Sequence, residues 1–387
     1  MSYTIGVGTW ECSPLERKLV NQVLDSGRLS YGPMSREFEN KFAGIHGSKY
    51  AVLSNSGTSS LQVALQAMKE IHKWNDGDEV IVPAVTFVAT ANIVLHNRMK
   101  PVLVDVDPDT YNMDVNKLHE VITPKTRAII PVHLFGQPAE MGWFEMFKSK
   151  NIKVIEDACE AAFANIYGKP VGAWGDIGCF STYVAHLLTT GVGGVATTSN
   201  PEYAAKMRSI VNHGRDGIYI DIDTEATPEV ISKRFSFDTI GHSFRITELE
   251  SALGVAQLDG WESMIAKRTA NADFLSDRLT DHGLDEYIKI PFASYGVAHS
   301  WMMYPIVVLD ESKWGLVEYL EANGVETREM LPLTNQPCYK GLWNEDDYPV
   351  AKKINESGFY VGCHQGLDEK DMGFIADTIS EYFDNGE

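Results

Sequence analysis

Basic residues are scarce in this sequence of 387 residues. It has 33 lysines and arginines against 53 aspartates and glutamates, which gives a formal net charge of -20 at pH 7. A protein that binds nucleic acid or anionic membranes without sequence preference needs basic patches, so this charge balance argues against both. An anionic ligand would need arginine, lysine or backbone N–H groups placed locally.

Cysteines are few, and no two of them form a CxxC pair. The five are Cys12, Cys159, Cys179, Cys338 and Cys363. Their odd number and wide spacing argue against a zinc site, an iron–sulfur cluster and a disulfide framework. We therefore expect no metal site, and thiols scattered in or near the core.

Long apolar runs are missing too. None reaches the length that crosses a membrane, and the start of the chain lacks the basic and apolar regions of a signal peptide. We expect a cytoplasmic protein without membrane contact. The 44% hydrophobic and 22% charged composition is that of an ordinary globular protein, long enough for one large and one smaller domain.

From about residue 50 onward, short apolar runs alternate with helical patterns. Candidate strands are residues 50–53, 80–82, 102–104, 128–132, 153–156, 179–182 and 194–197, and candidate helices include 57–69, 114–122 and 139–148. Nearly continuous apolar strands separated by helices predict an α/β fold with a mostly parallel sheet covered on both faces. Ligands of such sheets usually bind at the carboxyl ends of the strands.

The flanking regions are expected to extend this core. After an extended N-terminal arm, Ser13 and Pro14 have the pattern of a helix N-cap and first turn, and Gly27 ends that helix. Polar residues 217–236 predict an excursion or mobile loop, and whether it closes over a site stays open. A long helix over about residues 247–279 would connect the two domains.

The C-terminal part has the pattern of a small α+β domain. An apolar strand is expected near residues 302–308, with helices over 313–323 and 369–382. We place the large domain at residues 1–250 and the linking helix with the small domain at residues 251–387.

Three segments near predicted strand ends carry polar residue types suited to ligand binding. Gly57 and Thr58 follow the first strand and open a helix, whose free backbone N–H groups can bind phosphate, although most such turns are only helix caps. Asp157 ends another strand. The segment from Cys179 to Gly194 combines a serine, Ser181, with a glycine-rich turn and contains no lysine.

In order and spacing these segments resemble the DegT/DnrJ/EryC1/StrS family of sugar aminotransferases. Members use pyridoxal 5'-phosphate (PLP) and its amino form, pyridoxamine 5'-phosphate (PMP), on the type I aminotransferase fold. The resemblance covers nearly the whole chain and implies this fold and these cofactors here. It also implies a homodimer with shared active sites.

The resemblance assigns cofactor roles to individual residues. Those implied to bind the cofactor are Gly57, Thr58, Phe87, Asp157, Glu160, Ser181 and Ser243. Phe87 would stack on the pyridine ring, and Asp157 would keep the ring nitrogen protonated so that the ring can accept electrons. Ser243 stands where the family has an asparagine that reaches the phosphate in the neighbouring subunit.

His186 occupies the position of the family's lysine, five residues beyond Ser181. Lysine can bind PLP as a Schiff base and also move protons, whereas imidazole has no primary amine and can only move protons. A lone histidine is more often structural than catalytic, but this position reverses that expectation. An ordinary imidazole pKa of roughly 6.5 suits a base at neutral pH.

The small domain adds a narrower resemblance. Residues 300–301 and 362–365 are similar to those of the lysine-lacking branch of the family, which removes the C3 hydroxyl of GDP-4-keto-6-deoxy-D-mannose. Candidate substrate-binding residues are Trp10, Arg28, Tyr31, Arg328 and His364. Arg328 could pair with a ligand anion.

Three functions remain open at this point. The first is a PMP-dependent 3-dehydratase of a nucleotide-linked 4-keto-6-deoxy sugar, with His186 as the base and glutamate as the expected amino donor. The second is a nucleotide-sugar aminotransferase whose lysine has been lost or replaced, and the third is a catalytically silent sugar-nucleotide-binding homologue. Retention of Gly57, Asp157 and Ser181 counts against the third, because a silent protein need not hold the cofactor.

Overall fold

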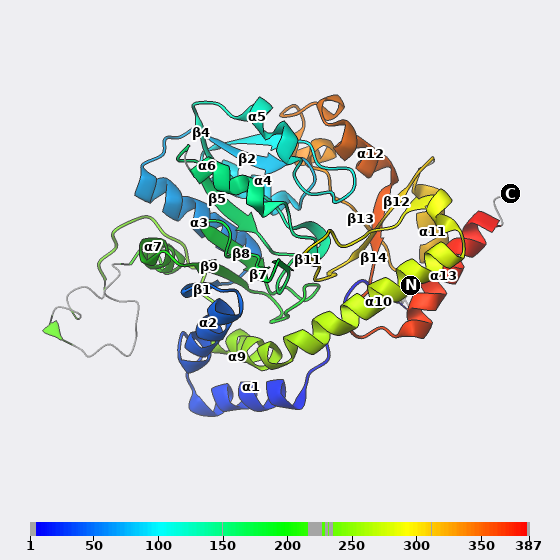
Figure 1. Cartoon of the computed structure of the whole chain (residues 1–387). Coiled ribbons are helices and arrows are strands. Elements are labelled where there is room, and N and C mark those ends of the chain that lie inside the picture. Colours follow the sequence, from blue (N-terminus) through cyan, green and yellow to red (C-terminus); the bar gives the residue numbers. More distant parts are fainter. Residues whose placement is uncertain are drawn as a thin grey trace.

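A computed structural model describes residues 5–148, 150–215, 227–228, 231, 235–310 and 312–384. A large sheet with its helices fills one side of the molecule, and a smaller layer of strands and helices lies on the other (Figure 1). The predicted excursion at 217–236 lies almost entirely outside the described residues. Among the described residues, no helix is both long and apolar enough to span a membrane.

The large sheet has seven strands in the order β1-β9-β8-β5-β4-β2-β3. They are β1 (Tyr50–Ser54), β2 (Glu79–Pro83), β3 (Lys100–Val104), β4 (Thr126–Ile129), β5 (Lys153–Asp157), β8 (Ile177–Ser181) and β9 (Gly194–Thr198). These are the seven predicted strands, within a few residues at their ends. All neighbours pair parallel except those of β9, which is antiparallel to both β1 and β8. The mostly parallel sheet is confirmed.

Helices cover both faces of this sheet, as the apolar strands predict. Successive residues of a strand point to opposite faces, and Val80 and Val82 belong to one apolar core while Ile81 belongs to another. The first core is closed by α2 (Pro33–Ile45), α3 (Gly57–His72), α4 (Val88–His96) and α7 (Pro201–Val211). The second is closed by the short helices α5 (Leu118–Val121) and α6 (Glu145–Lys148).

The small domain is built on a second, antiparallel sheet in the order β10-β12-β14-β13. Its elements are β10 (Ile288–Lys289), β12 (Tyr304–Val308), β13 (Arg328–Glu329), β14 (Gly358–Val361), α11 (Trp314–Ala322), α12 (Pro349–Ser357) and α13 (Glu369–Asp384). Residues of this region and of the preceding helix share an apolar core of their own, which also contains Ile5 of the N-terminal arm. A domain boundary at residue 250 stays a prediction.

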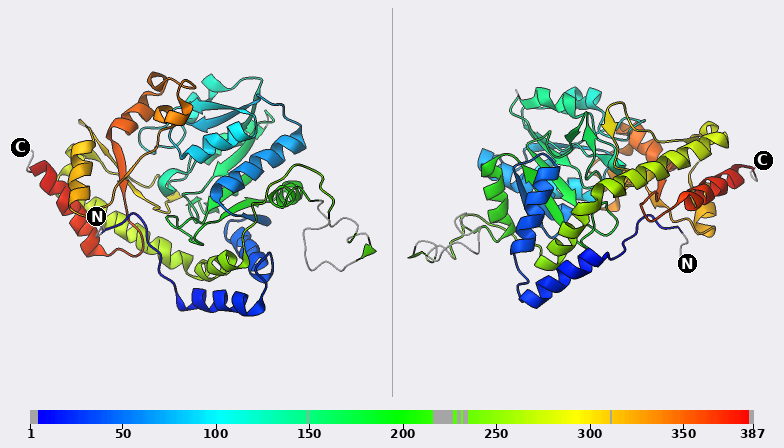
Figure 2. Two further views of the ribbon diagram at one scale, coloured as in Figure 1. Left: turned by 180° about the vertical axis from the view of Figure 1, so that it is seen from behind. Right: turned by 60° about the horizontal axis from the view of Figure 1, so that its bottom comes forward.

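The predicted connecting helix is not continuous. It consists of α9 (Glu248–Gln257) and α10 (Trp261–Asp281), separated by a 3-10 turn. Gly260 in that turn has φ of -120° and ψ of 9°, outside the helical region. α9 packs on α1 (Pro14–Ser26) and α2, the first turns of α10 still pack on the large core through Trp261 and Ile265, and the later turns of α10 belong to the core of the small domain (Figure 2).

Two shorter helices were also predicted too long. Residues 114–122 form a 3-10 turn followed by α5, and residues 139–148 form a 3-10 turn followed by α6. Gly142 lowers the helix propensity of the second segment. A third small sheet, β11-β6-β7, joins Val297–Ala298, Asn165–Ile166 and Lys169–Pro170.

The N-terminal helix is capped as predicted. Ser13 accepts a hydrogen bond from the Glu16 N–H, and the Glu16 side chain accepts one from the Ser13 N–H, which completes a capping box. Pro14 occupies the first turn, and Gly27 ends the helix with φ of 67°. This fixes the point at which the N-terminal arm enters α1.

The close contact between α2 and α9 requires a glycine, Gly254, in α9. A Cβ at Gly254 would lie 2.5 Å from two ring carbons of the buried Phe38. Gly254→Ala should therefore destabilise the protein by roughly 1–3 kcal/mol through overpacking, although alanine is the better helix former. Urea unfolding measures this change.

Gly44→Ala in α2 is the matched control, because a Cβ at Gly44 would have no neighbour within 4 Å. This substitution should stabilise the protein by about 0.5–1 kcal/mol. If the free energy of unfolding of Gly254→Ala were as high as that of Gly44→Ala, the packing argument would be contradicted.

Candidate functional site

The site forms where the ends of β5 and β8 meet the N-terminus of α3. A Cβ on Gly57 would lie 2.8 Å from Cβ of Ser181 and 2.9 Å from Sγ of Cys159. Only glycine lets the backbone of α3 approach this closely. The structure thus brings together Gly57 and Ser181, two residues predicted from distant parts of the sequence, and places them beside Cys159, two residues beyond Asp157.

The first turn of α3 has the character of an anion site. Ser56 caps the helix by accepting a hydrogen bond from the Ser59 N–H at 3.0 Å. Thr58 is exposed, and Ser181 is 8% exposed. N–H groups and the positive end of a 16-residue helix therefore lie next to Ser181, an arrangement that suits a phosphate.

Asp157 is a buried carboxylate without a cationic partner among its described hydrogen bonds. It is 4% exposed and accepts hydrogen bonds from the Thr90 hydroxyl at 2.7 Å and the Cys159 N–H at 3.2 Å. Burial raises its pKa above the ordinary value. A protonated pyridine nitrogen would supply the missing positive charge.

Phe87 is linked to this carboxylate through Thr90, in the first turn of α4. The Thr90 N–H donates to the Phe87 carbonyl at 3.2 Å, and the Thr90 hydroxyl bonds to Asp157. The Phe87 ring is 53% exposed although the residues around it in sequence are largely buried. An exposed ring next to a buried acid is what a flat aromatic ligand would cover.

Glu160 is held near Asp157 by the turn at Phe135. Its carboxylate accepts a hydrogen bond from the Phe135 N–H at 2.8 Å. Burial, with a smaller contribution from the negative charge of Asp157, raises the pKa of Glu160 to about 7. Near neutral pH this carboxyl group can therefore donate as well as accept a hydrogen bond.

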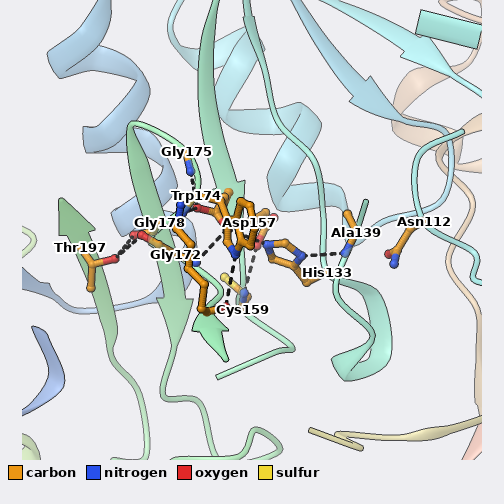
Figure 3. Close-up of polar contacts among 12 residues, drawn as sticks. Asn112, His133, Ala139, Asp157, Cys159, Gly172, Trp174, Gly175, Gly178 and Thr197 are labelled. Carbon is orange, nitrogen blue, oxygen red and sulfur yellow. Dashed lines mark hydrogen bonds and ion pairs between the residues drawn. The ribbon is translucent and has the colours of Figure 1, made fainter. Parts of the chain in front are cut away.

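A buried polar network behind Asp157 was not found from the sequence (Figure 3). Glu156 and His133 are fully buried, with 3.1 Å between His133 Nε2 and Glu156 Oε2, and the Ala139 N–H donates to His133 Nδ1. Glu156 also accepts from the N–H groups of Gly172, Trp174 and Gly175 at 2.6–2.8 Å. Since the next residue is Asp157, the network fixes the end of β5. In the sequence, the only indication of this network was the pair of adjacent acidic residues, Glu156 and Asp157, at the end of a predicted strand.

His186 lies in the loop between β8 and β9 and is half-buried. Its N–H donates to the Tyr183 carbonyl at 2.8 Å, and its ring packs edge-on against Tyr183 with centroids 6.0 Å apart. Atom Nδ1 is buried without a hydrogen-bond partner. A nitrogen without accessible surface cannot be reached by a ligand in this conformation, and the Tyr183 carbonyl next to the ring partly offsets the effect of burial on the pKa of His186.

The pKa of His186 is lowered to about 4, first by burial and then by the positive charge of Arg268. The ordinary value of roughly 6.5 expected from the sequence therefore does not hold in the folded chain. At neutral pH the imidazole is neutral and able to accept a proton. It is also a weaker base than a solvated histidine.

Ser243 lies at the surface of this chain. It is exposed and accepts a hydrogen bond from Arg245 at 3.1 Å. The adjacent Phe244 carbonyl accepts from the Asn55 N–H at 2.7 Å, so the segment runs beside the loop that precedes α3. Its predicted contact with a neighbouring subunit stays a prediction.

The substrate candidates fall into two groups. Tyr31 donates to Glu39 at 2.6 Å, and Arg208 bonds to the same carboxylate at 2.8 Å, so the Tyr31 hydroxyl is part of an internal cluster. Burial and Glu39 raise its pKa. Arg28 donates to the Tyr31 carbonyl at 3.0 Å. The structure does not bring this pair to His186 through any described contact.

The other candidates are linked by the N-terminal arm. His364 Nδ1 accepts from the Gly366 N–H at 3.2 Å, so Nε2 carries the proton and donates to the Gly6 carbonyl at 3.1 Å. Both ring nitrogens are thus occupied, Nε2 by the N-terminal arm and Nδ1 by the turn that follows His364. Glu326 accepts from the Val7 N–H at 2.9 Å and forms an ion pair with Arg328.

The arm then reaches the loop of His186. A Cβ on Gly8 would lie 3.4 Å from Cα of Ala185, the residue before His186. Trp10 follows, 44% exposed, and donates from its indole nitrogen to Glu16 at 3.0 Å. Trp10 is thus connected to the loop through the arm, and His364 lies near His186 as well, because the charge of Arg268 lowers the pKa of both histidines. In the described part of the chain, no cluster of three or more His, Cys, Asp or Glu side chains could hold a metal ion.

The chain is similar in sequence to known proteins that belong to one family. The chain matches the model of the DegT/DnrJ/EryC1/StrS aminotransferase family over residues 12–380. It is 35% identical over 372 residues to the GDP-perosamine synthase of Caulobacter vibrioides, covering 95% of each chain.

Solved structures give the same fold. An aminotransferase from Psychrobacter cryohalolentis matches with a TM-score of 0.90 and 30% identity over 98% of this chain and 99% of that one. The E. coli GDP-4-keto-6-deoxy-D-mannose-3-dehydratase with bound hydrated PLP matches with a TM-score of 0.88 and 25% identity over 98% and 100%. The chain therefore belongs to the DegT/DnrJ/EryC1/StrS aminotransferase family, whose enzymes use PLP on the type I aminotransferase fold.

Proposed function

We propose that this protein is a PMP-dependent 3-dehydratase, which removes the C3 hydroxyl of a nucleotide-linked 4-keto-6-deoxy sugar. The observation that carries the proposal is His186. The loop between β8 and β9 contains no lysine, and the side chain at the family's lysine position is an imidazole that is neutral at pH 7 because burial lowers its pKa. Such a group can move protons but cannot anchor PLP covalently.

The surrounding residues fit the cofactor. Phosphate would be held by the first turn of α3, at Gly57 and Thr58, and by Ser181. Phe87 would cover one face of the pyridine ring, and Asp157 would pair with its nitrogen. When bound, the cofactor supplies an amino group that condenses with the sugar ketone and a ring that accepts electrons.

His186 would then take a proton from the cofactor's C4' methylene. The neutral form of the imidazole, which can accept a proton, dominates near pH 7 because burial lowers its pKa. Departure of the C3 oxygen is helped by a proton from His186 or from a bound water. Arg328 and Trp10 are proposed to contact the nucleotide sugar at the mouth of the site. Arg28, Tyr31 and His364 are left out of this proposal, because their polar groups are engaged within the chain.

The net reaction balances with glutamate as amino donor. The C3–O bond of the sugar is broken and replaced by a C–H bond, a two-electron reduction at carbon. Glutamate is oxidised by two electrons to 2-oxoglutarate, and its nitrogen leaves as ammonia, while the oxygen lost by the sugar is balanced by the oxygen gained in the keto acid. We further propose a homodimer in which Ser243 contacts the neighbouring subunit's cofactor phosphate.

A nucleotide-sugar aminotransferase is the second candidate. The name of the Caulobacter relative favours it, since perosamine is an amino sugar, and that relative is 35% identical. The E. coli structure favours the dehydratase instead. It holds hydrated PLP, in which the aldehyde carbon is bonded to oxygen rather than to a lysine nitrogen.

The first test is product identity. Protein loaded with PMP and given glutamate and GDP-4-keto-6-deoxymannose should form a sugar nucleotide lighter by one oxygen, with one equivalent of 2-oxoglutarate, as measured by mass spectrometry and enzymatic assay. An amino sugar would support the aminotransferase. The absence of turnover across GDP-, UDP- and dTDP-linked ketosugars would favour the silent homologue.

A second test concerns covalent attachment. Borohydride reduction of the PLP-loaded protein should leave the intact mass unchanged, because His186 offers no primary amine. The matched control is His186→Lys, which should gain one pyridoxyl group under the same conditions. A pyridoxyl adduct on the wild-type protein would mean that another lysine has taken over, and the assignment of His186 would fail.

A third test removes the proton-transfer group. His186→Asn keeps a polar side chain of similar size, so PMP should still bind, as followed by its absorbance after gel filtration. Dehydration should fall by roughly 10²–10⁴-fold, the usual contribution of a general base. Dehydration at the wild-type rate would show that another group moves the proton.

A further inference from the structure

The loop that carries His186 is held by the side chain of Gln257, the last residue of α9. The Thr189 N–H donates to Gln257 Oε1 at 2.8 Å, and Gln257 Nε2 donates to the Thr189 carbonyl. One side-chain amide therefore satisfies both backbone groups of a residue three positions beyond His186.

Glu16 determines which way this amide points. Gln257 Nε2 also donates to Glu16 Oε1 at 2.9 Å. Glu16 is 2% exposed, and its carboxylate accepts from the Ser13 N–H at 2.5 Å and the Trp10 indole at 3.0 Å. Because a carboxylate accepts hydrogen bonds and does not donate them, it selects the nitrogen end of the Gln257 amide.

Within the described part of the chain, the other backbone hydrogen bonds of the loop are internal. The Thr182 N–H donates to the Gly193 carbonyl at 2.9 Å, the Thr190 N–H to the Thr182 carbonyl at 2.9 Å, and the Val184 N–H to the Gly191 carbonyl at 3.2 Å. These bonds join the two sides of the loop to each other. The bonds of Gln257 differ because they join the loop to α9 and, through Glu16, to α1.

The segment between His186 and Thr189 is tightly packed. Leu187 and Leu188, which separate His186 from Thr189, are 2% and 1% exposed. A displacement of Thr189 would therefore be passed along buried side chains to His186. Polar anchoring at one end and apolar burial between the two residues restrict where the imidazole can lie.

We propose that Gln257 is a positioning residue for the proton transfer of His186, with Glu16 orienting its amide. This inference rests on the function proposed above for His186. Gln257 itself would touch neither substrate nor cofactor. Its importance follows from geometry, since a misplacement of about 1 Å can cost roughly 100-fold in rate.

Two variants of Gln257 separate shape from hydrogen bonding. Gln257→Leu keeps a similar volume and removes every hydrogen bond. Gln257→Glu keeps the shape but turns an acceptor toward the Thr189 carbonyl and Glu16, both of which are acceptors. Gln22→Leu, on the exposed side of α1, is the matched control and should behave as wild type.

The first measurement uses the protein without cofactor. Hydrogen exchange followed by mass spectrometry should show roughly 10-fold faster exchange in peptides covering residues 182–193 of both variants, with strands β4 and β5 unchanged. NMR titration of His186, assigned by its loss in His186→Asn, should show the pKa moving from about 4 toward the ordinary roughly 6.5 as the loop admits water.

The second measurement is kinetic. In both variants kcat should fall by about 10–100-fold, while KM should stay within about threefold of wild type. The reason is that the lost contact misplaces the imidazole for proton transfer and leaves the binding of the sugar unchanged. Wild-type exchange and titration in the two variants would overturn the proposal. So would exchange that rises equally throughout the protein, which would indicate general destabilisation.

Failure of the proposed function would look different. If the wild-type protein does not dehydrate any ketosugar, the exchange and titration measurements still decide whether Gln257 fixes the loop. If the wild type dehydrates and Gln257→Leu has both a mobile loop and an unchanged kcat, His186 does not need this anchor and the positioning role is wrong.

Discussion

The close approach of α3 to the end of β8 is the contact on which the rest of the site depends. Gly57 lies so near Ser181 and Cys159 that no side chain fits between them. This contact sets the distance from the helix N-terminus to the ends of two strands. The buried network of Glu156 and His133 then fixes Asp157 on the same edge. A phosphate and a ring nitrogen, the two ends of one cofactor, would thus be held by rigid elements.

The sequence predicted much of this arrangement, for reasons visible in particular residues. All seven strands of the large sheet were found because they are largely buried and form nearly unbroken apolar runs. Gly57, Asp157 and Ser181 were singled out through the family resemblance, and the structure places Gly57 beside Ser181, with Asp157 at the end of the adjacent strand β5; their cofactor roles stay predictions. The break between α9 and α10 was missed because helical periodicity continues through it, and Gly260 alone does not indicate a turn.

The environment of His186 could not be predicted from the sequence. Its depressed pKa arises from burial and from Arg268, which is 82 positions away and reaches the site only through the fold. The same holds for Glu156, whose hydrogen bonds to backbone N–H groups depend on a turn at 172–175. Polar side chains at the substrate end were the hardest to assign, since Tyr31 and His364 are occupied by contacts within the chain.

The antiparallel strand β9 gives the loop of His186 a property that parallel strands lack. Because β8 and β9 are consecutive and pair directly, the loop between them is the tip of a hairpin. Hairpins form from contacts close in sequence, whereas the parallel strands must wait for distant segments to meet. The position of His186 is therefore set by a local pair of strands, whereas the parallel strands around Asp157 are set by segments that are distant in sequence.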